Sequence, residues 1–467
     1  MQAHPAGPRH AQMAQEPHAP VSILDPVQTH VWPDSAERID SGELCIGGQG
    51  VTTLASEFGT PLFIFDEQDV RERAREFARA YLADNESGTV YYAAKAFLSV
   101  AAARWVAEEG LGIDVASGGE LAIVIRAGIP GDKLLMHGNN KSEGEIRSAL
   151  VYGVSRIVID SFDEIVRVAA IAADLNVVAH VLVRATVGVE AHTHEFIATA
   201  HEDQKFGLSV QEGDVEEAVR RIAKLPSLNF VGLHSHIGSQ IFDSAGFEIA
   251  AARVVSVAHA IYDTQGIVCQ EFNLGGGMGI AYLPEDDPLS VVLMANEIKD
   301  IVNRECENVG IAVPALCFEP GRAIVGRAGI TLYEVGTVKK VKLDHGERTY
   351  VSVDGGMSDN IRTSLYGAQY SVALVSRNSS NEPVLCRVVG KHCESGDIVV
   401  RDAWLPGDIT PGDLIAVAAT GAYCRSMASN YNQVPRPPVV SVREGASQLV
   451  LRRETFDDLL ALDPFAG

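Results

Sequence analysis

Lys95 is the first residue along the chain whose type and position could do chemistry. It closes a short apolar run, Thr89 to Ala94, directly before a helix-like run, Ala96 to Val106. In barrel enzymes, catalytic residues lie where a strand ends and a helix follows. A lysine held among apolar neighbours is poorly solvated in its charged form, which favours a neutral amine that can act as a nucleophile or form a Schiff base. A lysine that reaches solvent from the strand end would explain the same pattern.

Glycines and an arginine at two later run ends suggest an anion site. Gly275, Gly276 and Gly277 follow an apolar run, and backbone N–H groups in such a segment can approach an anion closely. Glu319, Pro320, Gly321 and Arg322 follow the next run, and the guanidinium suits two-point contact with an oxyanion. A tight turn would explain the glycines alone. Because barrel phosphate sites often use the loops after strands seven and eight, phosphate binding is the favoured interpretation.

Two histidines, His234 and His236, stand one residue apart at another run end, and Ser239 follows them. A histidine in such a place is often structural, and a closely spaced pair could also bind metal. No third ligand stands at metal-like spacing in the sequence, so we expect no metal here. An aromatic platform at His236 and a phosphate-binding hydroxyl at Ser239 are favoured instead.

Three loops further along carry residues that are ambiguous when taken singly. Cys393 and Glu394 lie in a turn-like stretch in which the thiol could be incidental, and Tyr423 stands in a glycine-flanked loop. Arg362 and Tyr366 are four residues apart, so both could face the same way on a helical turn.

Eight short apolar runs alternate with amphipathic helical stretches after Asp66. They are Val90 to Ala94, Gly112 to Val115, Leu134 to His137, Arg156 to Ile159, Ala179 to Val183, Phe230 to His234, Glu271 to Leu274 and Leu316 to Phe318. This alternation predicts a TIM-like (β/α)8 barrel, in which the C-terminal ends of all strands converge on one mouth. Polar residues or glycines stand at nearly every run end, including Asp114, so a functional face is expected there.

The remaining segments suggest a second domain. We assign residues 61–325 to the barrel and residues 326–467, where Val, Thr and Tyr runs alternate with turn residues, to an appended, mainly antiparallel β-barrel domain. Residues 31–60 contain strand-like pieces and are expected to join the β domain. Residues 1–30, rich in Ala, Pro, His and Gln, are predicted to be a disordered tail.

Composition narrows the class of partner. The 467 residues are 46% hydrophobic and 21% charged, with a net charge of −23. Such an acidic chain is a poor match for nucleic acid or an anionic membrane, so a small-molecule partner is favoured. Seven scattered cysteines without a Cys-x-x-Cys pair predict a reduced, cytoplasmic protein, and the N-terminal stretch lacks the pattern of a signal peptide.

Taken together, these motifs resemble the fold-type III pyridoxal-phosphate decarboxylases from about residue 40 onward. The residues that carry the resemblance are 92–96 (YAAKA), 114–120 (DVASGGE), 236–240 (HIGSQ), 275–277 (GGG), 319–322 (EPGR), 393–397 (CESGD) and 421–423 (GAY). Several motifs that occur in this order along one chain are a specific mark of the family. One departure is Phe97, where relatives often carry a polar residue.

The resemblance implies that pyridoxal 5'-phosphate is bound at the barrel mouth. Lys95 matches the lysine that holds the cofactor covalently, His236 the residue stacked on its ring, and Glu319 the carboxylate that faces the ring nitrogen. The positions that match residues around the cofactor and its phosphate are Asp114, Ser239, Gly275, Gly276, Gly277, Pro320, Gly321, Arg322 and Tyr423.

The resemblance also implies a homodimer in which the second subunit supplies the Cys393 loop. Cys393 matches the proton donor, and Glu394 the residue that binds the distal amino group of the substrate. Residues that match the distal-carboxylate site are Arg322, Arg362 and Tyr366, with Tyr423 also near the substrate. The implied reaction is the decarboxylation of meso-2,6-diaminopimelate to L-lysine and CO2, the last step of lysine biosynthesis.

Other activities remain open at this stage. A sibling decarboxylase would act on ornithine, arginine or a carboxylated polyamine, but these lack a distal amino-carboxylate, and a buried unpaired guanidinium is costly. An amino-acid racemase shares the barrel and cofactor, although the Cys393 loop does not suit it. A non-catalytic, decarboxylase-like regulator would be expected to lose Lys95 or Cys393, and both are present.

Overall fold

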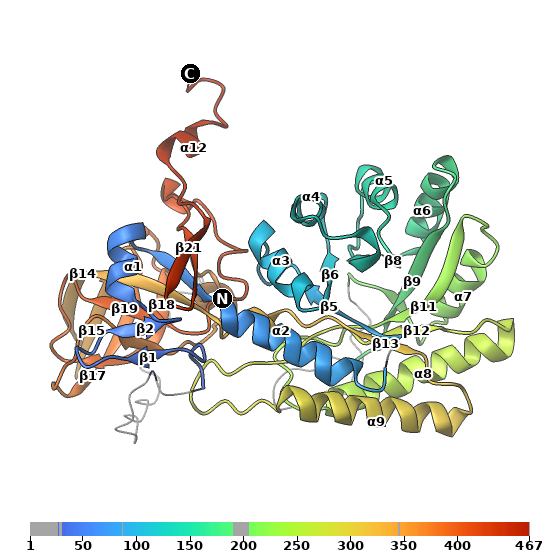
Figure 1. The fold of residues 1–467 in the computed structure, drawn as a ribbon, viewed down its shortest axis with the longest axis horizontal. Helices are drawn as coiled ribbons and strands as arrows, with labels where there is room; N and C mark the ends of the chain where they lie inside the picture. The colour runs from blue at the N-terminus through green and yellow to red at the C-terminus, as the bar shows by residue number, and fades with distance from the viewer. Residues whose placement is uncertain (1–26, 28–29, 86, 190–204, 344–345, 467) are drawn as a thin grey trace. The chain divides into compact units, whose positions relative to one another are not determined.

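The computed structural model describes Val27 and residues 30–85, 87–189, 205–343 and 346–466 (Figure 1). The tail predicted for residues 1–30 therefore lies almost wholly outside the described residues. The chain forms two compact units. We call residues 71–280 and 287–324 the barrel unit, and the described parts of residues 1–70, 281–286 and 325–467 the sheet unit.

Eight parallel strands close the barrel unit into a TIM-like barrel, as the sequence predicts. They are β5 (Thr89–Ala93), β6 (Gly112–Val115), β7 (Leu134–Met136), β8 (Arg156–Ile159), β9 (Ala179–Thr186), β11 (Leu228–His234), β12 (Glu271–Asn273) and β13 (Ala315–Phe318). The pairings β13 with β5 and β8 with β9 close the ring, and β10 (Leu208–Ser209) adds to β9. Six strands fill the barrel with one buried cluster: Tyr91, Leu135, Val158, Leu182, Val231 and Cys317.

Helices surround these strands (Figure 1). They are α2 (Glu67–Leu82), α3 (Val100–Glu108), α4 (Gly118–Ala127), α5 (Glu143–Tyr152), α6 (Phe162–Asp174), α7 (Asp214–Ile222), α8 (Ala245–Gln265), α9 (Val291–Val309) and the short α10 (Arg322–Val325). At the N-terminus of five of them a serine hydroxyl accepts a hydrogen bond from a backbone N–H of the first turn. These serines are Ser99, Ser117, Ser142, Ser161 and Ser290. These caps satisfy N–H groups that lack helical partners, so each loop after a strand ends at a defined residue.

The sheet unit is built on a nine-stranded, mostly antiparallel sheet. Its strands are β4 (Leu62–Asp66), β14 (Gly329–Leu343), β15 (Gly346–Val353), β16 (Val372–Leu374), β17 (Pro383–Val389), β18 (Ile398–Pro406), β19 (Leu414–Val417), β20 (Val439–Arg443) and β21 (Ala446–Leu451). Two pairings, β15 with β17 and β4 with β20, are parallel. The expected mainly antiparallel domain is confirmed: its pairings run from β18 to β21, and β19, paired with β16, joins this path at β14.

The N-terminal segment packs within the sheet unit. A small sheet of β1 (Glu37–Arg38), β2 (Leu44–Ile46) and β3 (Gln49–Gly50) precedes α1 (Val51–Phe58), and its apolar side chains share a core with those of β4 and β14. Strand β4 lies beyond residue 60, where the sequence indicates the start of the barrel, but it pairs with β14 and β20. A single buried strand does not reveal from its own sequence which sheet it joins.

Two short helices complete the sheet unit, α11 (Arg362–Tyr366) and α12 (Phe456–Leu460). No helix among the described residues combines the length and the apolar composition needed to cross a membrane.

Candidate active site

The barrel mouth gathers most of the residues that the sequence singles out. Lys95 follows β5, Asp114 lies near the end of β6, and Glu319 follows β13. Ala94 and Ala96 are buried, but the Lys95 side chain between them is exposed. The desolvation that we expected at this lysine is therefore absent, and its position at the mouth remains the argument for a chemical role.

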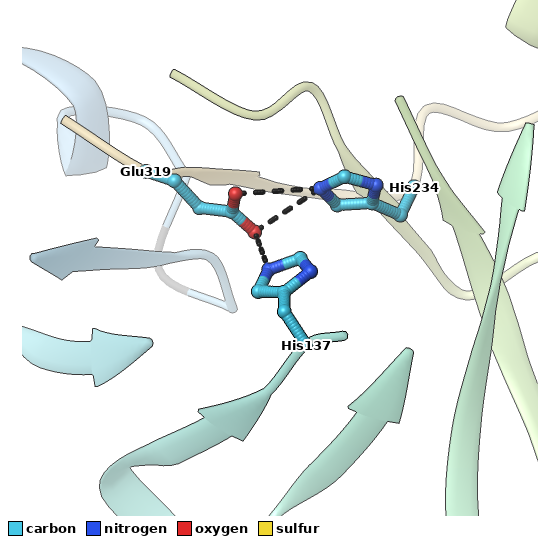
Figure 2. A group of neighbouring side chains, drawn as sticks. All are labelled: His137, His234 and Glu319. Carbon is cyan, nitrogen blue, oxygen red and sulfur yellow. Dashed lines mark hydrogen bonds and ion pairs between the residues drawn. The ribbon is translucent and has the colours of Figure 1, made fainter. Parts of the chain in front are cut away.

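Glu319 lies at the centre of a cluster that the sequence reasoning did not find (Figure 2). His137, which follows β7, has its Nε2 atom 2.8 Å from Glu319 Oε1. His234, at the end of β11, has its Nε2 atom 3.3 Å from Glu319 Oε2, and the two imidazole rings pack edge to face with centroids 4.7 Å apart. His137 stands at the end of one of the predicted runs, and this position was the only feature of the sequence that could have marked it as a residue of the mouth. Its partner could not be read from sequence because 182 residues separate it from Glu319.

These three side chains also have the chemistry of metal ligands, since their candidate ligand atoms lie within 4.8 Å of one another. No further ligand for His234 stands at metal-like spacing in the sequence, but the fold brings two candidates, His137 and Glu319, close to it. The contacts of 2.8 and 3.3 Å are, however, within the range of hydrogen bonds.

Burial and hydrogen bonding fix the charges in this cluster. Burial raises the pKa of Glu319, but His137 and His234 outweigh that effect and hold it well below its usual range. Burial lowers the pKa of His137, and it lowers the pKa of His234 to about 4, despite the attraction of Glu319. At neutral pH the cluster is therefore a carboxylate that accepts hydrogen bonds from two neutral imidazoles.

Asp114 and His236 are neutral groups near the Glu319 carboxylate. Burial, followed by the charge of Glu319, raises the pKa of Asp114 well above its usual range, because two nearby carboxyls resist ionising together. Burial lowers the pKa of His236 well below its usual value, and the charge of Lys95 adds to that shift. His236 is thus a neutral ring at neutral pH.

Arg322 and Ser239, two of the predicted phosphate residues, are joined at the barrel mouth. Arg322 is buried and donates a hydrogen bond from Nη2 to Ser239 Oγ over 2.9 Å. The glycine run is required here: Gly275 and Gly277 have φ of +70° and +113°, and a Cβ on Gly276 would lie 2.1 Å from the carbonyl oxygen of Glu319. A guanidinium, a hydroxyl and a bare backbone form a donor set that fits a phosphate group.

Gln240 bridges two segments of the candidate phosphate site. Its side-chain amide donates to the carbonyl of Ile280 over 3.0 Å and accepts from the N–H of Ile280 over 3.1 Å. Its backbone has φ of +60°, which is uncommon for a residue other than glycine. This residue, part of a motif in the sequence but given no role there, connects the Ser239 loop to the segment after the glycine run.

Arg362 of the sheet unit is a buried cation among phenols. Its Nη1 donates to the hydroxyls of Tyr282 and Tyr370 over 3.0 and 2.5 Å. Tyr423, whose φ is +66°, places its ring centroid 6.0 Å from the guanidinium carbon. Arg362 and Tyr366 are the first and last residues of α11, so their spacing of four places them on the same side of the helix, where Arg362 is 7% exposed and Tyr366 is 66% exposed. Tyr282 and Tyr370 carried no motif and could not be selected from sequence.

The Cys393 loop is braced by polar contacts within the sheet unit. Cys393 is exposed, whereas the other six cysteines are buried, and none of the seven is in a disulfide. Its backbone N–H donates to Asn432 Oδ1 over 3.1 Å. Glu394 accepts from the N–H of Gly396 over 3.1 Å, so this carboxylate caps its own turn.

Comparison with known proteins gives consistent matches over most of the chain. Residues 67–326 match the family model described as the pyridoxal binding domain of pyridoxal-dependent decarboxylases. The chain is 54% identical to a diaminopimelate decarboxylase of Mycobacterium leprae, over 99% of this chain and 100% of the relative. It is 44% identical to one of Bacillus subtilis, over 91% and 96% of the two chains. A crystal structure of diaminopimelate decarboxylase from M. jannaschii in complex with L-lysine superposes with a TM-score of 0.86 and 32% identity, covering 92% and 98% of the two chains.

Proposed function

The chain belongs to the pyridoxal-dependent decarboxylases, and from this premise we propose that it converts meso-2,6-diaminopimelate to L-lysine and CO2. The observation that carries the proposal is the near-complete match to relatives with this activity in their names, on a barrel whose mouth presents the Glu319 carboxylate and a phosphate cradle.

The barrel residues would hold pyridoxal 5'-phosphate. Lys95 would bind it covalently, and the neutral ring of His236 would stack on it. Ser239, the glycine run and Arg322 would bind its phosphate. The donor set described above and the positive φ angles of the glycines support this assignment.

Glu319 would bind the protonated ring nitrogen. Its low pKa and its hydrogen bonds from neutral groups leave it a full negative charge for that contact. When bound, the cofactor supplies an electron-withdrawing ring that stabilises the electron pair left on carbon as CO2 departs. The protein contributes the charge that keeps the ring nitrogen protonated.

The sheet unit would supply groups for the substrate. We assign Arg362 to the distal carboxylate, together with Arg322 and Tyr366, and Glu394 to the distal ammonium. The buried guanidinium of Arg362 supports its role, because only phenols solvate it among the described residues. Tyr423 lies beside it, in a backbone conformation that often marks a functional site.

Cys393 would donate the proton to the carbon that has lost CO2. It is the one exposed thiol among the seven cysteines, which supports this role. We infer a homodimer in which this loop serves the site of the second subunit, and a cytoplasmic location, which the unpaired cysteines suit.

The activity is tested by adding meso-diaminopimelate to the purified, cofactor-loaded protein and identifying the products. We expect lysine and CO2 in equal amounts, and little turnover of ornithine or arginine. Lys95→Ala should lose the visible absorbance of bound cofactor and nearly all turnover, while Lys133→Ala, an exposed lysine of the same unit, should keep both. Faster turnover of ornithine than of diaminopimelate would refute the substrate, and a protein that binds no cofactor would refute the reaction.

Sharing of sites between subunits is tested by mixing two inactive variants, Lys95→Ala and Cys393→Ala. Random exchange in a twofold dimer should restore about a quarter of wild-type activity, because half the dimers are hybrids with one intact site. If the mixture stays inactive although subunits exchange, the loop acts within its own chain.

A further inference from the structure

The hydrogen bonds around Glu319 assign the proton positions of the two histidines. The Nδ1 atom of His234 is buried and has no hydrogen-bond partner among the described residues. A protonated imidazole carries two N–H donors, and a buried donor without an acceptor costs about 1–3 kcal/mol. His234 is therefore neutral, with its hydrogen on Nε2, where it donates to Glu319. The carboxylate accepts from His137 as well, so its negative charge is solvated but not cancelled.

The segment that carries His137 is rigidly anchored. Four residues after it, Lys141 donates from Nζ to the carbonyls of Gly138 and Val158 over 2.6 and 2.7 Å. The same Nζ pairs with Glu164 at 2.9 Å, and both side chains are at most 2% exposed. A lysine that is buried this deeply and fully paired fixes its loop, because removing either partner would strand a charge. The His137 ring is thus held at one place above β7.

The charged groups around the cluster do not neutralise Glu319. Asp114 is another acid, protonated because of burial and the charge of Glu319. Two cations act on the cluster at longer range: Lys95, which is exposed, and Arg184, which lies partly buried on β9. No Lys or Arg side chain of the described residues lies within 4.0 Å of the Glu319 carboxylate, whose ion-pair contacts are with histidines alone.

We propose that His137 is a positioning residue, which holds the Glu319 carboxylate ionised and in place so that it can bind a protonated aromatic nitrogen. The inference rests on the proposed function and goes beyond it, by giving a task to His137, a residue to which the proposed function assigns none. His234 supplies the second hydrogen bond to the same carboxylate. The shorter distance, 2.8 against 3.3 Å, makes His137 the stronger donor.

The test compares His137→Gln, which keeps an amide N–H donor, with His137→Leu, which has none. Each protein is loaded with pyridoxal phosphate labelled with ¹⁵N in the ring, and the nitrogen signal is followed by NMR as the pH is raised. Wild type and the glutamine variant should keep the ring nitrogen protonated near neutral pH. The leucine variant should lose that proton at lower pH and bind the cofactor about tenfold more weakly, which corresponds to about 1.4 kcal/mol.

A leucine variant that binds cofactor and shows the wild-type nitrogen signal at every pH would overturn the inference. If His137→Leu does not fold, His137→Asn makes the same comparison, since its shorter amide should not reach Glu319. Failure of wild type to bind the cofactor would instead refute the proposed function. A titration of the cofactor-free protein with Zn²⁺ completes the test: a stoichiometric site that His137→Leu abolishes would identify the cluster as a metal site, and we expect none.

Discussion

Glu319 in the barrel unit and Arg362 in the sheet unit are each 7% exposed, carry opposite charges and are stabilised in the same way. Two neutral imidazoles donate to the carboxylate, and the guanidinium donates to two neutral phenols. Neither charge has an oppositely charged Lys, Arg, Asp or Glu partner within 4.0 Å among the described residues.

The comparison shows how a protein can bury a charge and still keep it available. A salt bridge would satisfy the charge and weaken its attraction for a ligand, while an unsolvated charge would be costly to bury. Neutral hydrogen-bonding partners avoid both outcomes. The two regions differ in their acid-base setting, because burial lowers the pKa of the two imidazoles, that of His234 to about 4, and raises the pKa of the Tyr370 phenol well above its usual range.

The largest effect is expected from removing the barrel charge with Glu319→Gln. The loss of a preorganised charge at the reacting centre should lower kcat by about 10³-fold. The matched control is Glu271→Gln, which removes another buried carboxylate at the start of β12, where it pairs with Arg156. It lies at the opposite end of the barrel, so its kcat should stay within a few-fold of wild type. Steady-state kinetics of both variants would measure these effects. A larger loss of kcat in Glu271→Gln than in Glu319→Gln would contradict the special role of the Glu319 charge.

An intermediate effect is expected from removing the sheet-unit charge with Arg362→Met. If Arg362 binds the distal carboxylate, kcat/KM should fall by about 10²-fold, mainly through KM, because a buried charge contact is lost. The spectrum of bound cofactor should not change. Arg387→Met removes another buried arginine of the same unit, from β17, and should reduce stability without raising KM. A wild-type KM in Arg362→Met would remove Arg362 from substrate binding.

The smallest effect on activity is expected at Asp359, a buried carboxyl that sharpens the contrast with Glu319. Burial raises the pKa of Asp359 to about 7, with Asp354 and Asp397 adding to the shift, whereas no histidine donates to it. The native state thus binds a proton that the unfolded state releases above about pH 4. The stability that this proton provides is full below pH 4 and is lost as the pH rises toward 7, at up to about 1.4 kcal/mol per pH unit.

Asp359→Asn should remove this pH dependence. As the pH rises from 4 to 7, the free energy of unfolding of this variant, measured by urea denaturation, should therefore increase relative to that of wild type. Its turnover should stay within a few-fold of the wild-type value. Parallel curves for the two proteins across this range would show that Asp359 is ionised in the native state.

Local sequence patterns were sufficient to predict the barrel and many of the residues at its mouth. The eight runs and the residues at their ends, such as Lys95 and Arg322, depend on the chain within a few residues, so sequence predicts them. The exposure of Lys95 and the burial of Arg362 beside the exposed Tyr366 could not be predicted, because residue types at short spacing do not say which side chains distant parts of the chain cover. The pairing order of the second sheet could not be predicted for a related reason, because the residue pattern of a strand does not say which other strand it pairs with.

The sequence by itself determined the family, the barrel and the chemical groups at the strand ends, because each is written in residue types at short spacing. Tertiary structure decided which of those groups meet. Closure of the ring through β13 with β5 and β8 with β9 brings His137 to Glu319 across 182 residues, and the fold of the sheet unit brings Tyr282 to Arg362 across 80. The charge of Glu319 follows from those contacts, because burial alone would have protonated it and two hydrogen bonds from distant strands keep it ionised.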